Sequence, residues 1–533
     1  MVSKKQKNDP PPSESSGTKR TSPMHNKSHT SLFDLRTTHG QVLFLFITIA
    51  ISSLIQLLPS ELIKNSLTVF NTKSINNCAN QTEDKIKLKS KPIYWTFGKS
   101  SSSDHLRHVH LVLDRLGFEL GSNETDWDLL WAHDYPFRIL YPKLHQLKAH
   151  QRVNHFPGCG FITNKVDLAT SRLKYIPRAF KLPKDKDDFF DFSNEHPQKL
   201  FVQKNNQHRH IYIRSVNEID FDNNDTFIQE YIANPLLVDG HKFDIGVYVI
   251  ITSVDPLRVY IYKGDVLFRY CPAKYYPFDA KILDKYIVGD DYLPTWDVPS
   301  LAQYYTGLGF GMKDSFDAYM SSKGRDTENI WIQVEDAIRT AILAKEKYIA
   351  DILKQFKSKN NFFEMMRFDL VIDDTLKVHL LEANMSPNLS SAHFLQNTLL
   401  YEQVIYNLLN LVGVGSTLHR ESMRKRSSAT ESMITSLKNV VVEPEICSTI
   451  PCSESCAPIE CELCRPCLSP DDIQDLYAAH REHLSRGDTK RIFPEPIIDK
   501  TLDLKNLKLL SPKNQKMTKW FYGKCVQESS WCS

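Results

Sequence analysis

The stretch of this chain that decides its fold reads Arg367-Phe-Asp-Leu-Val-Ile-Asp-Asp-Thr-Leu-Lys-Val-His-Leu-Leu-Glu-Ala-Asn-Met-Ser-Pro387. Two apolar runs on either side of Asp373-Asp374-Thr375 predict two antiparallel strands joined by a tight turn. Because side chains alternate across a strand, Glu382 and Asn384 share one face, and antiparallel pairing brings Asp369 beside them. Two carboxylates and an amide oxygen form an oxygen-only site that suits Mg²⁺. The alternative is a hairpin with one solvated face.

A second stretch, upstream, carries a lysine and an acid that could face a ligand. It reads Phe227-Ile-Gln-Glu-Tyr-Ile-Ala-Asn-Pro-Leu-Leu-Val-Asp-Gly-His-Lys-Phe-Asp-Ile-Gly246. Turns separate one predicted strand from the next, and the second strand carries Lys242 and Asp244 on one face. A lysine in a nucleotide pocket can neutralise phosphate charge, and an adjacent acid can hold ribose hydroxyls. A surface ion pair is the alternative.

The chain around these stretches, residues 90–415, alternates strand-like and helix-like runs. Tyr248-Val-Ile-Ile-Thr252 and Arg258-Val-Tyr-Ile-Tyr262 are typical of strands, whereas residues 330–345 repeat apolar side chains at three and four positions, as in an amphipathic helix. This mixture predicts an α+β or α/β enzyme body. A hydrophobic fraction of 41% is enough for a sizeable core, and a formal net charge of only +3 does not indicate a nucleic-acid binder.

The N-terminal region predicts a disordered basic tail and a membrane anchor. Residues 1–40 are rich in Ser, Pro, Lys and Asn and lack hydrophobic periodicity. Residues 42–58 carry no charge and end at Pro59, a length at the short end of the ~17–25 residues that span a bilayer as a helix. Basic residues outnumber acidic ones before this span, so the positive-inside rule places the N-terminus in the cytosol and the body across the membrane. A buried core helix and a cleaved signal peptide are the alternatives.

The C-terminal region predicts a polar linker at residues 416–445 and a cysteine-rich module at 446–533. Most of the eleven cysteines lie in this module. Those between Cys447 and Cys467 fit disulfides if the module lies across the membrane, and zinc or free thiols if it lies in the cytosol. Ser469-Pro-Asp-Asp-Ile combines a capping serine, a first-turn proline and acids, so a short helix should begin there. Glycosylation tripeptides, such as the one at Asn80, do not decide the side of the membrane.

These stretches resemble the tubulin tyrosine ligase-like family in order and spacing, over residues 90–415. The matching runs are Trp127-Asp-Leu-Leu-Trp131, Asn154-His-Phe-Pro-Gly158, Asn164-Lys-Val-Asp-Leu168, Gln229-Glu-Tyr-Ile-Ala-Asn-Pro235, Asp239-Gly-His-Lys-Phe-Asp244, Asp255-Pro-Leu-Arg-Val-Tyr260 and Leu381-Glu-Ala-Asn-Met-Ser-Pro387. The resemblance implies an ATP-grasp fold, in which two α+β subdomains hold ATP between them.

The same resemblance implies a role for each matching residue. The residues implied to bind ATP are Lys204, Gln229, Tyr231, Ile232, Lys242 and Asp244, with the glutamine, tyrosine and isoleucine at the adenine and the lysines at phosphate. The residues implied to hold Mg²⁺ are Asp369, Glu382 and Asn384. Arg269 is implied to steady the transferring phosphoryl group. Arg269 and Lys242 are together the implied catalytic residues.

The implied activity is the addition of glutamate to glutamate side chains of tubulin. ATP would activate the acceptor carboxylate through its γ-phosphate, and the amine of free glutamate would attack the resulting acyl phosphate. Positioning and charge neutralisation then supply most of the catalysis, as in other phosphoryl transfers. The implied partners are the acidic tails of tubulin in microtubules, free glutamate and, through residues 42–58, a membrane.

Three departures from the family pattern leave other functions open. The glycine-rich loop expected after Lys204 is replaced by Asn-Asn-Gln-His-Arg-His, and the Lys-Phe-Asp-Leu-Arg run ends in Gly246 instead of arginine. Residues 290–296 do not match the family's His-Leu-Thr-Asn segment. Each lost ionic contact could cost ~2–4 kcal/mol of transition-state stabilisation. A nucleotide-binding pseudoenzyme and a ligase with a luminal, non-tubulin substrate are therefore the alternatives.

Overall fold

The computed structural model describes residues 91–205, 211–221, 226–425 and 428–533. The predicted tail at residues 1–40 and the predicted span at 42–58 lie outside these residues. Within the described part of the chain, no helix combines the length and the apolar character needed to cross a membrane. Residues 90–533 form one compact unit.

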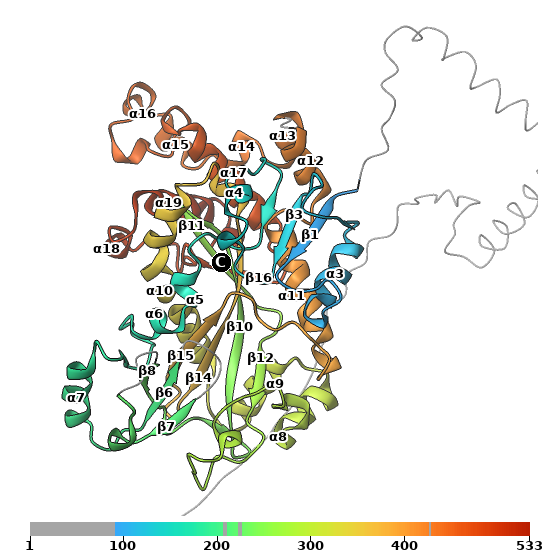
Figure 1. The fold of residues 1–533 in the computed structure, drawn as a ribbon. Helices are drawn as coiled ribbons and strands as arrows, with labels where there is room; N and C mark the ends of the chain where they lie inside the picture. Colours follow the sequence, from blue (N-terminus) through green and yellow to red (C-terminus); the bar gives the residue numbers. More distant parts are fainter. Residues whose placement is uncertain (1–90, 206–210, 222–225, 426–427) are drawn as a thin grey trace, which may run out of the picture. The chain divides into compact units, whose positions relative to one another are not determined.

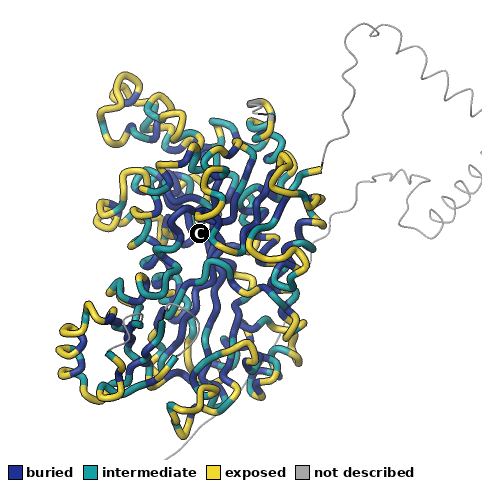
Figure 2. The backbone as a smooth tube through the Cα atoms, viewed as in Figure 1, coloured by how far each residue is buried: buried dark blue, intermediate teal, exposed yellow. Residues whose placement is uncertain are grey.

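A long strand, β10 (His241–Val254), runs through the middle of the main sheet (Figure 1). β14 (Glu364–Ile372) pairs antiparallel along one of its edges, and β11 (Leu257–Tyr262) and β12 (Leu267–Tyr270) pair along the other. Nearly every residue of β10 and β14 is buried (Figure 2). Apolar residues on both faces of these strands are covered by other elements, as in a sheet enclosed within a protein core.

β14 also forms the predicted hairpin with β15 (Val378–Asn384), so the interpretation of the first stretch as a strand pair is confirmed. Asp369 lies directly opposite Glu382, and Arg367 lies opposite Asn384. This register places the three predicted metal ligands together. The remaining strands of the sheet are β9 (Leu237–Val238), β13 (Leu293–Pro294) and β16 (Thr489–Phe493).

Two four-stranded sheets flank the main one, giving the predicted α+β architecture (Figure 1). The N-terminal sheet is parallel and contains β1 (Ile93–Phe97), β2 (Glu119–Leu120), β3 (Leu129–Ala132) and β4 (Arg152–Val153). The other is antiparallel and contains β5 (Ala179–Lys181), β6 (Phe201–Asn205), β7 (Tyr212–Arg214) and β8 (Thr226–Glu230).

The longest helix, α10 (Glu328–Leu353), contains the predicted amphipathic segment and packs on β10, β15 and β16. Its buried residues recur every three or four positions, as the sequence pattern requires. The other α-helices that the structure describes before residue 415 are α3 (Asp104–Arg115), α4 (Tyr141–Leu144), α5 (Gly160–Thr163), α6 (Lys165–Ala169), α7 (Lys186–Glu195), α8 (Pro299–Ala302), α9 (Met312–Ser322) and α11 (Thr398–Leu411).

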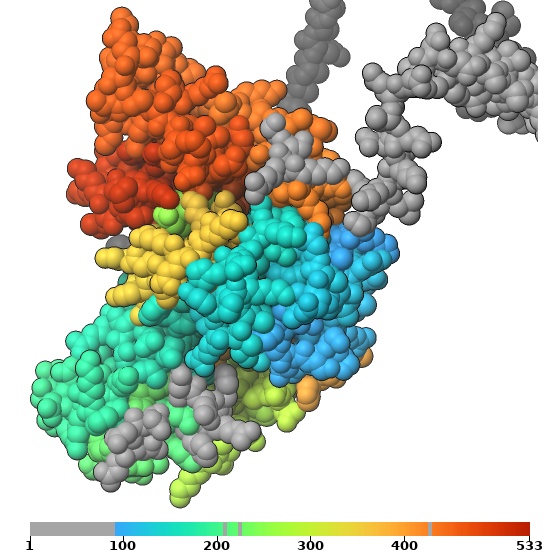
Figure 3. All heavy atoms as spheres, turned by 45° about the horizontal axis from the view of Figure 1, so that its top comes forward, coloured from blue at the N-terminus to red at the C-terminus, as the bar shows by residue number. Residues whose placement is uncertain are grey.

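The C-terminal region differs from the prediction, because residues 416–445 are not a linker and 446–533 are not a separate module. Helices begin at once, and β16 joins the main sheet beside β11. Figure 3 shows the orange and red C-terminal residues lying against the yellow residues of α10. The helices are α12 (Thr417–Lys425), α13 (Ser428–Ile434), α14 (Leu437–Val440), α15 (Pro444–Cys447), α16 (Ile450–Glu454), α17 (Pro470–Leu484), α18 (Leu504–Leu507) and α19 (Pro512–Gln527).

The physical reason for this difference is that the C-terminal region completes the edge of the main sheet. An unpaired edge strand exposes backbone donors and acceptors, and β16 satisfies those of β11. A buried ion pair reinforces the contact, since Arg258 donates from Nε and Nη2 to the Glu482 carboxylate at 2.8 and 3.0 Å. The helix predicted at Ser469 is confirmed: Ser469 caps α17, with Pro470 in the first turn.

Eight cysteines of this region form four disulfides. The pairs are Cys447–Cys464, Cys452–Cys461, Cys456–Cys467 and Cys525–Cys532. The pairing uses every cysteine of the segment 461–467, so the zinc alternative for that segment is wrong. Disulfides of this density are typical of oxidising compartments.

We expect Arg258→Met to lower the free energy of unfolding of the full chain by about 3–5 kcal/mol, because it leaves the Glu482 carboxylate buried without its ionic partner. Arg172→Met is the matched control, since Arg172 pairs with Asp188 on the exposed surface. Denaturant unfolding monitored by tryptophan fluorescence measures both variants. Equal stability of the two variants would contradict the integration of the C-terminal region into the sheet.

Candidate active site

One cavity of about 600 Å³ lies between the main sheet and the antiparallel sheet of β5–β8. Strands β6 and β8 line it on one side, and β10, β12, β14 and β15 line it on the other. All ten residues that the sequence singled out line this cavity, namely Lys204, Gln229, Tyr231, Ile232, Lys242, Asp244, Arg269, Asp369, Glu382 and Asn384. The structure therefore brings together every predicted site residue, although their individual roles stay predictions.

The three predicted metal ligands converge at the end of the β14–β15 hairpin. Asn384 donates from Nδ2 to Asp369 Oδ2 at 3.0 Å and to Glu382 Oε1 at 3.1 Å. Glu382 also accepts from Lys165 Nζ at 2.5 Å. Burial raises the pKa of Glu382, but the charge and hydrogen bond of Lys165, together with Lys204 and Asn384, outweigh burial and lower that pKa to about 2. Glu382 is thus a carboxylate at neutral pH, and the hairpin is not merely a solvated surface.

A chain of ion pairs connects this cluster to β10 and β12. Arg269 donates from Nε and Nη2 to the two oxygens of Asp244, at 2.8 and 2.9 Å. The same Nη2 lies 3.2 Å from Asp369 Oδ2. Arg367 donates to Asp369 from Nε at 2.6 Å and from Nη2 at 2.9 Å. Asp369 therefore lies between two guanidinium groups, and Asp244 holds Arg269 in place.

The two predicted phosphate-binding lysines lie on different strands. Lys242 is buried and donates to the Tyr286 carbonyl oxygen at 2.9 Å, so it forms no surface ion pair with Asp244 and that alternative is wrong. Lys204, on β6, lies 5.2 Å from the centre of the Phe227 ring. Burial lowers the pKa of Lys204 to about 8, which keeps it mostly protonated at pH 7.

The predicted adenine residues lie at the β8 end of the cavity. Gln229 is buried and donates to the Pro177 carbonyl oxygen at 3.3 Å. The hydroxyl groups of Tyr231 and Tyr275 are 2.9 Å apart. The Gln229 amide and the Tyr231 hydroxyl thus each have a partner within the protein. These partners fix the two side chains in place as part of the cavity wall. Such pre-formed walls are common in nucleotide-sized pockets.

Sequence reasoning gave no role to Lys165 and Arg367, two of the charged residues that line the cavity. Lys165 stands in the quoted Asn164–Leu168 run, and its pairing with Glu382 joins residues far apart in the chain. Arg367 opens the stretch that decides the fold, and the signal available was its spacing of two from Asp369. The departure after Lys204 includes residues 206–210, which lie outside the described residues.

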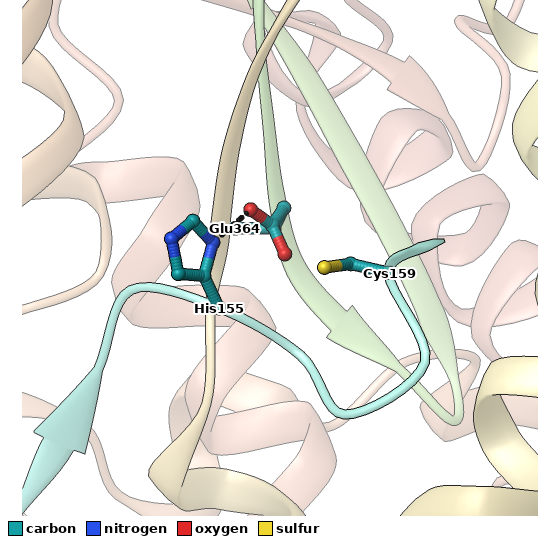
Figure 4. Close-up of side chains that lie close together, drawn as sticks. All are labelled: His155, Cys159 and Glu364. Atoms are coloured by element: carbon teal, nitrogen blue, oxygen red, sulfur yellow. Dashed lines mark hydrogen bonds and ion pairs between the residues drawn. The ribbon is translucent and has the colours of Figure 1, made fainter. Parts of the chain in front are cut away.

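A second cluster, formed by His155, Cys159 and Glu364, brings three potential metal ligands within 4.8 Å of one another (Figure 4). His155 Nδ1 lies 2.6 Å from Glu364 Oε1, and its Nε2 lies 2.9 Å from the Ala132 carbonyl oxygen. Burial raises the pKa of the Cys159 thiol, which disfavours the thiolate that metals require. This cluster is therefore a buried polar brace between β14 and the loop after β4.

Comparison with known proteins identifies what the chain is similar to. A family model described as the tubulin-tyrosine ligase family matches residues 143–421, more than half of the chain. The chain is 38% identical over 450 residues to a probable tubulin polyglutamylase, ttll-15, of Caenorhabditis elegans, covering 81% of this chain and 85% of that protein. It is 31% identical over 330 residues to the tubulin polyglutamylase TTLL6 of Mus musculus and 27% identical over 434 residues to the tubulin monoglutamylase TTLL4 of Homo sapiens. These matches cover 58% and 74% of this chain but only 39% and 35% of the two mammalian proteins.

We expect nucleotide binding to the cavity to depend on Mg²⁺ and on Glu382. Glu382→Gln removes one carboxylate of the oxygen-only cluster, and ATP affinity in the presence of Mg²⁺ should fall about tenfold or more. Glu230→Gln is the matched control, because Glu230 lines the same cavity but pairs with Lys199. Isothermal titration calorimetry with and without Mg²⁺ measures both. Equal affinity in all four conditions would contradict the metal assignment.

Proposed function

The chain belongs to the tubulin-tyrosine ligase family, and on this premise we propose that it is an ATP-dependent tubulin polyglutamylase, which joins glutamate to glutamate side chains of tubulin. The observation that carries the proposal is the single cavity in which all ten predicted residues meet. The relatives named as tubulin polyglutamylases support the reaction class and the acceptor. In this ATP-grasp arrangement, the main sheet and the β5–β8 sheet hold ATP between them.

The residues at the end of the β14–β15 hairpin fit Mg²⁺. Asp369 and Glu382 supply carboxylate oxygens, and Asn384 donates from Nδ2 to both of them. Its amide oxygen would face the metal after a rotation of the amide group. Hard oxygen donors with room for substrate phosphates are the environment that Mg²⁺ prefers. When bound there, Mg²⁺ supplies positive charge that neutralises phosphate oxygens. Lys165 keeps Glu382 ionised and oriented before any ligand arrives.

The proposed reaction has two steps with ATP and glutamate as substrates. A carboxylate oxygen of the acceptor glutamate attacks the γ-phosphorus of ATP, which forms an acyl phosphate and releases ADP. The amine of free glutamate then attacks the acyl carbon, forms an amide bond and releases phosphate and a proton. Lys204, Lys242 and Arg269 stabilise negative charge on the phosphates, and their fixed partners hold them in position.

Full-length protein incubated with tubulin, ATP, Mg²⁺ and glutamate should add glutamate masses to tubulin tails. Asp369→Asn should lower the initial rate at least about 100-fold, because it disrupts both the metal cluster and the arginine network. Asp191→Asn, on the exposed face of α7, is the matched control. Mass spectrometry of the tubulin measures the additions.

The outcomes of this experiment separate the alternatives. Addition of another amino acid in place of glutamate would keep the chemistry and contradict the donor. ATP binding without any addition to tubulin would contradict tubulin ligation and favour the pseudoenzyme or another acceptor.

A second candidate function keeps this chemistry and changes the acceptor to a glutamate-containing protein of the secretory pathway. The four disulfides favour it, because such bonds persist in oxidising compartments and are rare in the cytosol. The uncharged run at residues 42–58 and the basic residues before it support a single-pass anchor with the N-terminus in the cytosol. In this candidate, the body faces the lumen or the exterior.

Glycosidase treatment of the full-length protein from cells tests this orientation. A luminal body should lose mass on treatment, with Asn80 as the expected glycan site and Asn123, on an exposed turn, as a second accessible one. Asn80→Gln and Asn123→Gln assign the site. The cysteines of the four disulfides should resist alkylation until a reductant is added. No mass shift together with freely alkylated cysteines would contradict the luminal orientation and leave tubulin as the acceptor.

A further inference from the structure

Gly246 on β10 lies directly beneath the side chain of Arg367 on β14. A Cβ atom added to Gly246 would lie 2.8 Å from Arg367 Cδ, closer than Cβ atoms approach other atoms in proteins, and a tight 3.1 Å from its Nε. In the strand register, Gly246 is opposite Asp369, and Arg367 is opposite Tyr248. The Arg367 side chain therefore crosses to the neighbouring strand and fills the space into which a side chain at position 246 would project.

The Arg367 guanidinium lines the cavity and is held firmly there. Its Nε and Nη2 atoms donate to Asp369, and Arg269 approaches the same carboxylate from β12. Each arginine thus donates to carboxylates from two of its nitrogens, Nε and Nη2. Among the residues that the structure describes, the Nη1 atom of neither arginine has a hydrogen-bond partner. These two Nη1 atoms remain available as charged donors beside the predicted metal ligands.

We propose that Arg367 is a catalytic residue that binds the terminal phosphate of ATP, and that it supplies from β14 the guanidinium that the family pattern places at position 246 on β10. The proposal rests on the proposed ATP-dependent ligation. Neighbouring strands lie about 4.8 Å apart, a distance that an arginine side chain spans easily. A guanidinium fork matches the oxygens of a phosphate and stays charged at all relevant pH values.

The position of Arg367 implies that arginines at positions 246 and 367 would exclude each other. An arginine at 246 and an arginine at 367 would compete for one volume, because even a Cβ at 246 meets the Arg367 side chain. A glycine at 246 is therefore the condition that allows the guanidinium to come from β14. The loss of arginine at position 246 then removes no cation from the cavity, which answers one argument for a pseudoenzyme.

The competing explanation is that Arg367 only braces Asp369 as a buried ion pair. A brace acts through the metal that Asp369 is proposed to hold, so its loss weakens the ATP analogue only when Mg²⁺ is present. A group that binds the terminal phosphate directly contributes to the binding of the analogue with and without Mg²⁺, and contributes little to the binding of ADP. The readout is therefore the dissociation constant of full-length protein for a non-hydrolysable ATP analogue and for ADP, each with and without Mg²⁺, by isothermal titration calorimetry. Melting temperatures of the same samples report on folding.

Arg367→Gly should weaken binding of the ATP analogue about thirtyfold while ADP binding changes by less than about threefold. The double variant Gly246→Arg with Arg367→Gly should bring the analogue back to within about threefold of wild type. Gly246→Arg alone should lower the melting temperature without improving affinity, because two guanidinium groups then crowd one space.

Equal weakening of both nucleotides in Arg367→Gly, weakening of the analogue only when Mg²⁺ is present, or no recovery in the double variant would overturn the proposal and leave Arg367 as a brace. If Arg367→Gly does not fold, Arg367→Lys replaces it, because lysine keeps the charge and loses the fork; it should weaken the analogue selectively, and unselective weakening would overturn the proposal. Failure of wild-type protein to bind either nucleotide would instead contradict the proposed function, so the two failures are distinguishable.

Discussion

The pairing of β14 with β10 on one side and with β15 on the other determines where the charged groups of the cavity lie. Through this pairing, Asp369 lies opposite Gly246 in one direction and opposite Glu382 in the other. Because side chains alternate along a strand, a slip of one residue would turn Asp369 and Arg367 to the opposite face of the sheet. Burial of nearly every residue of β10 and β14 opposes such a slip.

The register brings opposite charges together in a buried place, where each group needs a partner. An isolated buried charge costs several kcal/mol, and the alternation of Asp244, Arg269, Asp369 and Arg367 avoids that cost. The same arrangement fixes donors before a ligand enters, so little reorganisation is needed when negative charge arrives. The brace formed by His155 and Glu364 anchors the far end of β14.

The sequence predicted those parts of the molecule that depend on local patterns. The β14–β15 hairpin, α10 and the start of α17 follow from periodicity, turn residues and capping, and the structure confirms them. β16 was missed because the run Thr489–Phe493 is short and its partner strand lies more than 200 residues earlier. The pairing of eight cysteines could not be deduced either, since about 105 pairings are possible. The role proposed for Arg367 could not be predicted either, because it depends on Gly246 lying beneath its side chain on the neighbouring strand.

In the proposed function, Asp369, Glu382 and Asn384 hold a divalent cation beside the phosphates of ATP. Crystals grown with Mn²⁺ and a non-hydrolysable ATP analogue test it directly, because Mn²⁺ is identified by its anomalous scattering. The account predicts an anomalous peak bound by the Asp369 and Glu382 carboxylates, next to the terminal phosphate. A peak at His155 and Glu364, or nucleotide in the cavity with no peak at Asp369, would contradict it.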